Sequence, residues 1–358
     1  MTDLKQYGYT QNNNTEAIKP EAGEMPACVT AVHRERFDLI SEEGIKHGKL
    51  KTSVYYGREE HPFPTVGDFV LIKNVDGGDC QIIKTLPRKS YFSRMDPKPG
   101  GFKEQAVAAN FDTVFIMQSL NQNFNLRRLE RYLTLTWQSG ATPVIVLTKD
   151  DLVDDSEQYI KEVESIAAGV DIISTSAKTG SGLIELEPYL KPGKTCVFLG
   201  SSGVGKSSLL NTLMGEEVME VKEIRDDDAR GRHTTTHRQL ITLPCGAHII
   251  DTPGMREIGM WEKGDGIQNA VSDVFADVEE HLGACKFSDC RHESEPGCAI
   301  RTAINNGAFT QERWESYLKL QREALYAEDK LKSIRERSAK HQAIAMWSRQ
   351  MKTKKEIW

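Results

Sequence analysis

The chain has 358 residues, of which 39% are hydrophobic and 27% charged, and its formal net charge is −6. This length suits two or three domains. The negative net charge excludes a protein that is attracted to nucleic acid by its overall charge. No apolar run follows the N-terminus or approaches the about 18 residues of a membrane span. We therefore expect a cytoplasmic, monomeric protein with no membrane association.

The first two predicted regions are a tail and a β-barrel. Residues 1–25 are rich in Asn, Gln, Glu and Pro, which predicts a mobile tail. Residues 26–104 hold five short runs separated by turn residues, which predicts a barrel of the OB type, whose face binds nucleic acid. The alternative is a small β module with no role in RNA binding. The expected strands are Cys28–Val32, Phe37–Ile40, Lys51–Tyr55, Asp68–Ile72 and Gln81–Thr85.

Two further domains are predicted after the barrel. Residues 105–266 alternate apolar strands with amphipathic helices, which indicates an α/β nucleotide-binding domain. Residues 267–358 predict a mostly α domain with a Cys/His cluster, a long polar helix around 310–338 and a basic tail. The expected α/β strands are Thr113–Met117, Pro143–Leu147, Asp171–Ser174, Thr195–Leu199 and His248–Ile250, and the expected helices are Leu126–Gln138, Glu157–Ala168 and Lys206–Met214.

A phosphate-binding loop of the form GxxxxGK[ST] follows the strand at 195–199 and precedes a helix. Its glycines let backbone N–H groups surround phosphates, Lys206 reaches the β and γ oxygens, and Ser207 ligates Mg²⁺. The expected ligand is therefore a nucleoside triphosphate with Mg²⁺. The residues expected to contact it are Gly200, Ser201, Ser202, Gly203, Val204, Gly205, Lys206, Ser207 and Ser208.

A second phosphate element, Asp-Thr-Pro-Gly, follows the strand at 248–250. Asp251 is placed to hold Mg²⁺ through water, and Gly254 to offer its N–H to the γ-phosphate. On its own this motif is also an ordinary turn. A polar segment between the two elements is expected to supply a further Mg²⁺ ligand, either Thr235 or Thr236, which the sequence does not separate.

Two short elements predict guanine selection. Asp151 can accept from guanine N1–H and the exocyclic amine, whereas adenine offers neither donor at these positions and would leave the carboxylate unpaired. Lys149 would pack over the base, and the backbone after Ser176 would meet the guanine carbonyl. Residues 148–151 read TKDD and resemble the guanine-selecting element NKxD, with Thr148 in place of its Asn. The residues expected at the base are Thr148, Lys149, Asp150, Asp151, Ser176, Ala177 and Lys178.

The order of these elements is unusual, because both base elements precede the phosphate loop. Ordinary GTPases have the opposite order, so the sequence predicts a circularly permuted GTPase. Every element follows a strand at one sheet edge, so permutation changes only the connections. No glutamine follows Gly254, where Ras-like enzymes hold a water-orienting Gln, so another group has to position the attacking water.

A cluster of Cys285, Cys290, His292 and Cys298 supplies three thiolates and one imidazole. This ligand set suits one tetrahedral, structural Zn²⁺ with no open position. The alternative is a group of free buried cysteines. Two other residues, His281 and Asp289, are runner-up ligands.

The chain resembles the bacterial ribosome small-subunit-dependent GTPase A family. The resemblance rests on 66–68 (VGD), 108–112 (AANFD), the GTPase elements in their permuted order and the cysteine cluster. It implies an OB-fold, a permuted GTPase domain and a zinc-binding domain. It also implies slow GTP hydrolysis stimulated by the small (30S) ribosomal subunit and a role in late maturation of that subunit. The family attributes activity to the switch-loop histidine that His233 matches; His237 is the fallback.

The segment 330–355 carries nine Lys/Arg against one acid. With Trp347 and Trp358 among these charges it is a candidate contact to rRNA phosphates, and the alternative is a solvated helix face. The basic linker 84–94 is a second candidate surface. Two rival functions stay open at this point: an RNA-binding module that uses GTP only as a ligand, and a GTPase with a non-ribosomal protein partner.

Overall fold

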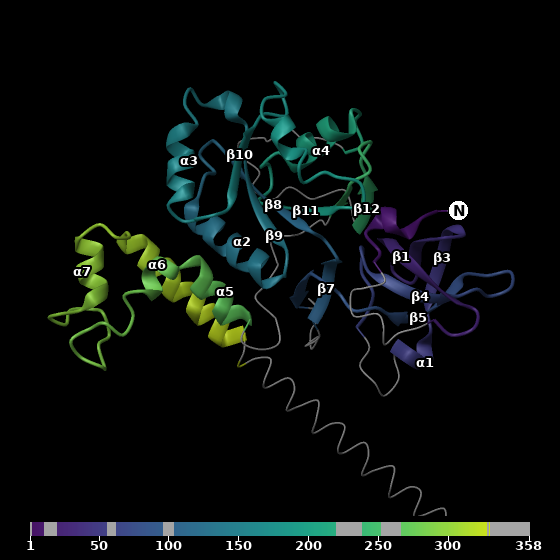
Figure 1. Cartoon of the computed structure of the whole chain (residues 1–358), viewed down its shortest axis with the longest axis horizontal. Coiled ribbons are helices and arrows are strands. Elements are labelled where there is room, and N and C mark those ends of the chain that lie inside the picture. Colours follow the sequence, from purple (N-terminus) through teal and green to yellow (C-terminus); the bar gives the residue numbers. More distant parts are fainter. Residues whose placement is uncertain are drawn as a thin grey trace, which may run out of the picture. The chain divides into compact units, whose positions relative to one another are not determined.

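The computed structural model describes residues 2–10, 20–55, 62–95, 104–219, 238–251, 266–327 and 329. These residues form two compact units (Figure 1). One contains the described residues of 1–94 and 105–259, and the other contains those of 95–104 and 260–358. In the described residues no helix is both long enough and apolar enough to span a membrane.

The N-terminal strands form a closed five-stranded barrel, which confirms the predicted fold of this region. Closure follows because β4 pairs antiparallel with both β5 and β1. Alternate side chains point inward and form an apolar core that includes Val29, Leu39 and Val70. The barrel order is β1 (Glu24–Val32), β2 (Phe37–Ser41), β3 (Gly44–Leu50), β5 (Cys80–Thr85) and β4 (Phe69–Lys73).

One barrel strand lies elsewhere than predicted. The third strand is β3, whereas the expected strand at 51–55 is mostly the short helix α1 (Thr52–Tyr55). The two glycines in Gly44–Leu50 favoured a turn, yet Gly48 is required inside the barrel. A Cβ atom at this position would lie 2.7 Å from Leu39 Cδ1 and 3.1 Å from Ile82 Cγ1. The glycine therefore lets β3 approach its neighbours closely.

The start of the expected mobile tail packs against the barrel. Residues Leu4–Tyr7 form the short helix η1, and Leu4, with 2% of its surface exposed, joins an apolar cluster with Ile40 and Phe69. The Tyr7 ring stacks on His248 at 4.6 Å, and His248 Nε2 donates to the Gln6 carbonyl at 2.8 Å. Desolvation lowers the pKa of the His248 imidazole, and the hydrogen bond to the Gln6 carbonyl raises it by a smaller amount. Polar composition concealed this anchoring of residues 2–9.

We expect Leu4→Ala to lower the free energy of unfolding by about 2 kcal/mol, because it removes a buried side chain from the barrel's outer surface. Urea denaturation measures this change, with Lys5→Ala, an exposed neighbour, as the matched control. Equal stability of the two variants would show that the segment contributes nothing to the fold.

The second part of this unit has the predicted α/β fold, but its sheet has six strands where the sequence predicts five. Five strands are parallel, and the sixth strand, β12, pairs antiparallel with β13. Figure 1 shows α2 and α3 beside the strands β9 and β10. The sheet order is β10 (Asp171–Thr175), β9 (Thr142–Thr148), β8 (Thr113–Ser119), β11 (Thr195–Gly200), β13 (His248–Asp251) and β12 (Arg238–Thr242).

The helices of this sheet begin where the sequence predicts. Both α2 (Leu126–Gln138) and α4 (Lys206–Met214) have the expected bounds, whereas α3 (Glu157–Glu164) ends before the expected Ala168. Ser165, the next residue, donates its hydroxyl to the Glu162 carbonyl at 2.7 Å and so competes with the helical pattern. The elements not predicted here are β6 (Tyr91–Met95), β7 (Glu104–Ala109), η3 (Asp150–Leu152), η4 (Leu183–Leu186) and the strand β12 (Arg238–Thr242).

Buried polar contacts join the barrel to the α/β sheet. Asp68 is fully buried and accepts from the Arg88 guanidinium at 2.8 and 2.7 Å. The carbonyl of Gly67 accepts from Asn110 Nδ2 at 3.0 Å. In addition, β1 pairs with β12, so that the barrel continues the sheet. The segments 66–68 and 108–112, noted above only for resemblance, therefore have a structural role at this junction.

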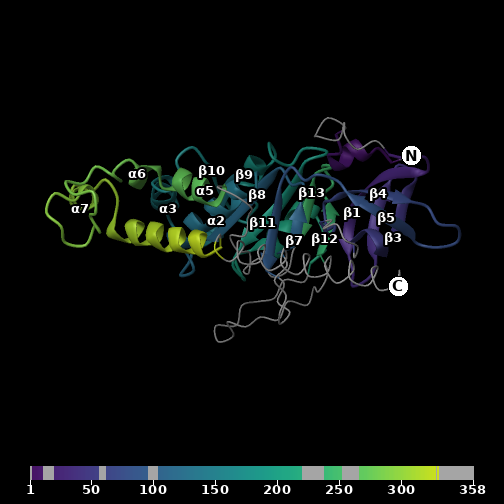
Figure 2. The same cartoon turned by 90° about the horizontal axis from the view of Figure 1, so that it is seen from below.

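The second unit is helical, as expected. The helix of residues 311–327 runs beside α5 (Figure 2), and its Arg313 donates to the Val274 carbonyl at 2.8 Å and to both carboxylate oxygens of Asp277. The Tyr317 ring lies 5.6 Å from Phe275. The expected extension of this helix to 338 and the basic segment 330–355 lie outside the described residues. The short helices are α5 (Gly266–Val274), α6 (Ala276–Glu279) and α7 (Ala299–Asn305).

Candidate nucleotide site and metal centre

The predicted nucleotide elements meet at one edge of the sheet. Parallel strands β8, β9, β10 and β11 end on the same side, and each is followed by a polar segment. The base elements come after β9 and β10, and the phosphate loop comes after β11. Permutation of the chain therefore leaves these elements together in space.

The phosphate loop leads directly from β11 into α4. Gly205, the residue before α4, has φ 102°, a left-handed conformation that favours glycine. The Lys206 ammonium donates to the carbonyls of Gly200 at 2.7 Å and Ser201 at 2.5 Å. The cation thus contacts the backbone of its own loop.

Thr148, the last residue of β9, bonds directly to the phosphate loop. Its hydroxyl lies 2.6 Å from the Val204 carbonyl, and at a longer 3.4 Å from the Gln118 carbonyl. The side chain is 5% exposed. Thr148 therefore makes a polar contact to the loop although it lacks the amide of Asn.

The second base element lies against the first. Ser176, fully buried, donates its hydroxyl to Asp151 Oδ1 at 2.7 Å, and its oxygen accepts from the N–H groups of Lys178 and Thr179 at 3.1 and 3.2 Å. The Lys178 ammonium lies 3.8 Å from Asp151 Oδ2. These contacts fix the Asp151 side chain in one orientation and leave its second oxygen facing an exposed surface cation.

Other predicted residues of the nucleotide site divide into described and undescribed ones. Lys149 adopts a left-handed backbone with φ 62°, and Asp150 follows it in η3. The carbonyl of Ala177 accepts from Thr212 Oγ1 on α4 at 3.3 Å. Asp251 ends β13, next to β11. The residues His233, Thr235, Thr236, His237 and Gly254 lie outside the described residues.

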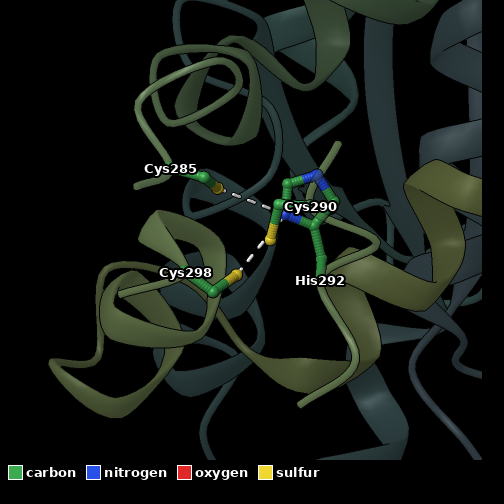
Figure 3. Close-up of side chains that lie close together, drawn as sticks. All are labelled: Cys285, Cys290, His292 and Cys298. Carbon is green, nitrogen blue, oxygen red and sulfur yellow. Dashed lines mark hydrogen bonds between the residues drawn. The ribbon is translucent and has the colours of Figure 1, made fainter. Parts of the chain in front are cut away.

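The Cys/His cluster brings its four predicted members together. One ligand atom of each of Cys285, Cys290, His292 and Cys298 lies within 4.8 Å of all the others, and Figure 3 shows the side chains converging. His292 Nδ1 is 3.5 Å from Cys285 Sγ and 3.4 Å from Cys298 Sγ. Such separations fit the edges of a tetrahedron around an ion with Zn–S bonds near ~2.3 Å.

The surroundings of the cluster favour a thiolate at Cys285, whereas desolvation and the neighbouring cysteines raise the pKa of Cys290 to about 11. The N–H groups of Ala299 and Arg301 lie 3.3 Å from Cys285 Sγ and 3.5 Å from Cys298 Sγ, where α7 begins. Desolvation raises the pKa of the Cys285 thiol, but hydrogen bonds from the Ala299 and Ile300 N–H groups and from the neighbouring cysteines outweigh it and lower that pKa. The described residues therefore fit a Zn²⁺ ion. Neither runner-up, His281 nor Asp289, belongs to the group of converging ligand atoms among these residues.

Sequence reasoning missed one polar group at this sheet edge. Asn123, in the loop after β8, donates from Nδ2 to Ser201 Oγ at 2.9 Å. Its position in the sequence could have indicated it, because Asn123 follows β8, and β8 ends at the same sheet edge as the strands that precede the base elements and the phosphate loop.

Comparisons with known proteins agree with this geometry. Residues 85–261 match the family model described as RsgA GTPase. The chain is 44% identical over 327 residues to the small ribosomal subunit biogenesis GTPase RsgA 2 of Lactiplantibacillus plantarum, and 45% identical over 323 residues to its namesake of Listeria monocytogenes, each alignment covering 90% of both chains.

Solved structures show the same fold. The crystal structure of YjeQ from Thermotoga maritima is 29% identical, with a TM-score of 0.60 over 84% of this chain and 99% of that one. The structure of YloQ, described as a circularly permuted GTPase, has a TM-score of 0.57 over 85% of this chain and 96% of that one, and at 23% identity it supports the fold only.

Proposed function

The chain belongs to the RsgA GTPase family and is a GTP hydrolase, and on that premise we propose that it assists late maturation of the small ribosomal subunit in the cytoplasm. It binds the subunit and its rRNA as a monomer, hydrolyses GTP slowly when free and turns it over faster when bound. The names of its relatives, which refer to small-subunit biogenesis, support this assignment.

The proposed site binds GTP through three groups of residues. Residues 200–208 surround the phosphates, Asp151 with 176–178 selects guanine, and Ser207 with Asp251 holds Mg²⁺. Gly254, and Thr235 or Thr236, complete the phosphate and Mg²⁺ contacts in this proposal, and His233 orients the attacking water. The Cys₃His cluster holds one structural Zn²⁺, which stabilises the second unit rather than taking part in hydrolysis.

One observation carries the assignment of the nucleotide site. The Thr148 hydroxyl joins the predicted guanine element to the Val204 carbonyl of the predicted phosphate loop at 2.6 Å, across 56 residues of permuted chain. A chance phosphate-loop sequence would not bond to a guanine element. The contact supports one continuous site for a single nucleotide.

Removing this contact gives a test of the site. We expect Thr148→Val to weaken GTP binding about tenfold, because the buried Val204 carbonyl loses its donor at a cost of about 1–2 kcal/mol. Fluorescent GTP titration measures the affinity, with Thr148→Ser, which keeps the hydroxyl, as the control. Equal affinities of the Val and Ser variants would argue against a role for this bond.

The function is tested by measuring GTP hydrolysis with the protein alone, with small subunits and with large subunits, and by repeating each with His233→Ala. We expect strong stimulation by small subunits only, and its loss in the variant. Binding of GTP without turnover under any condition would favour an RNA-binding module that uses GTP as a ligand. Turnover that neither subunit stimulates would favour a non-ribosomal partner.

A further inference from the structure

Asn123 holds the phosphate loop from outside the recognised nucleotide elements. Its Nδ2 donates to Ser201 Oγ at 2.9 Å, joining residues 78 positions apart. Ser201 is the second residue of the loop, next to Gly200 at the end of β11. The bond therefore connects the segment after β8 to the part of the loop that leaves the sheet.

The orientation of the Asn123 amide is fixed by its neighbours. Arg128 Nη1 donates to Asn123 Oδ1 at 3.0 Å, and a guanidinium has donors only, so the oxygen has to face Arg128 and the NH₂ has to face Ser201. The Asn123 backbone is held as well. Its N–H donates to Asn121 Oδ1 at 3.0 Å, and its carbonyl accepts from Gln118 Nε2 at 3.1 Å.

Ser201 also supports the lysine of the loop. Its carbonyl accepts from the Lys206 ammonium at 2.5 Å, beside the Gly200 carbonyl at 2.7 Å. In phosphate-binding loops this ammonium serves the β and γ oxygens. An ammonium that serves phosphate has to share or leave these carbonyls, so the position of Ser201 determines where the cation lies. Asn123 holds Ser201 through its hydroxyl, whereas Lys206 contacts its carbonyl.

We propose that Asn123 is a positioning residue for GTP hydrolysis, which acts through Ser201 on the ammonium of Lys206. The proposal rests on the proposed function of this loop as the GTP site. Without Asn123, Ser201 is free to follow the ammonium, and the cation is less well placed when charge develops on the transferred phosphoryl group. We therefore expect Asn123→Ala to lower kcat about tenfold while KM for GTP changes less than about twofold.

A double-mutant cycle tests the route through Ser201. Intrinsic GTP hydrolysis and GDP affinity are measured for Asn123→Ala, Ser201→Ala and the combined variant, with Gln122→Ala, an exposed neighbour, as the control. If Asn123 acts through Ser201, the double variant loses no more activity than the worse single variant. Independent, multiplicative losses would overturn the proposal, as would an equal loss of GDP affinity, which indicates a general disruption of the loop.

A conservative pair protects the test against poor folding. Ser201→Thr keeps the hydroxyl that accepts from Asn123, so it should hydrolyse GTP faster than Ser201→Ala, which lacks that hydroxyl. Equal rates of these two variants would overturn the proposal even if Asn123→Ala fails to fold. Failure of the proposed function is a different result, because the wild-type protein would then show no GTP hydrolysis.

Discussion

Replacing Cys290 by serine is expected to abolish zinc binding and to unfold the metal-binding part of the second unit. Structural zinc in small domains supplies on the order of 10 kcal/mol of apparent folding free energy. The zinc site joins both ends of the segment 285–298, because its four ligands converge there and Cys298 also caps the start of α7. Zinc content should fall from one ion per chain to nearly none.

A tryptophan provides the structural readout for this prediction. The Trp314 ring lies 5.4 Å from the His292 ring in an edge-to-face arrangement and is 6% exposed. Loss of the metal should release His292 and expose Trp314, which shifts its fluorescence to longer wavelength. Cys245→Ser is the matched control, since Cys245 is an exposed cysteine outside the cluster. Normal zinc content in Cys290→Ser would contradict the proposed ligand set.

Much of the fold could be predicted from the sequence because apolar patterns determine it locally. The bounds of α2 and α4 follow from helical periodicity between strands, and the parallel strands follow from apolar runs. Composition misled where contacts distant in sequence decide the structure. Gly48 lies in a strand because Leu39 and Ile82 leave no room for a side chain, and Leu4 is buried because the barrel has an apolar outer surface.

In the candidate site, too, the sequence predicts some features and misses those that depend on contacts between distant residues. Motifs named the residues that carry chemistry, since Asp151 and Lys206 are of a type that the chemistry requires. Motifs could not reveal the contacts that orient these residues. The bonds from Thr148 to Val204 and from Asn123 to Ser201 join segments that only the folded sheet brings together. Supporting residues of this kind have no fixed spacing from the motif, so a single sequence gives only their approximate place, the end of a neighbouring strand.

Asp151→Asn is expected to change the base that the protein prefers. The carboxylate can accept from guanine N1–H and the exocyclic amine, and hydrogen bonds to a charged group contribute about 1.5–3 kcal/mol each. The NH₂ group of an asparagine would instead face the N1–H and amine donors of guanine, and two donors cannot form a hydrogen bond. We expect GTP affinity to fall about 10³-fold, near the sum of both bonds.

The contacts of Ser176 predict which base the Asp151→Asn variant should prefer. The Ser176 oxygen already accepts from two N–H groups, so its proton has to go to residue 151, and an asparagine there has to turn its oxygen toward Ser176. The NH₂ group then faces the base. Xanthine carries a carbonyl where guanine carries the amine, so xanthosine triphosphate should bind Asp151→Asn more tightly than GTP does. Competition between the two nucleotides measures this, with Asp154→Asn, an exposed neighbour, as the control. A variant that keeps its preference for GTP would show that Asp151 does not contact the base.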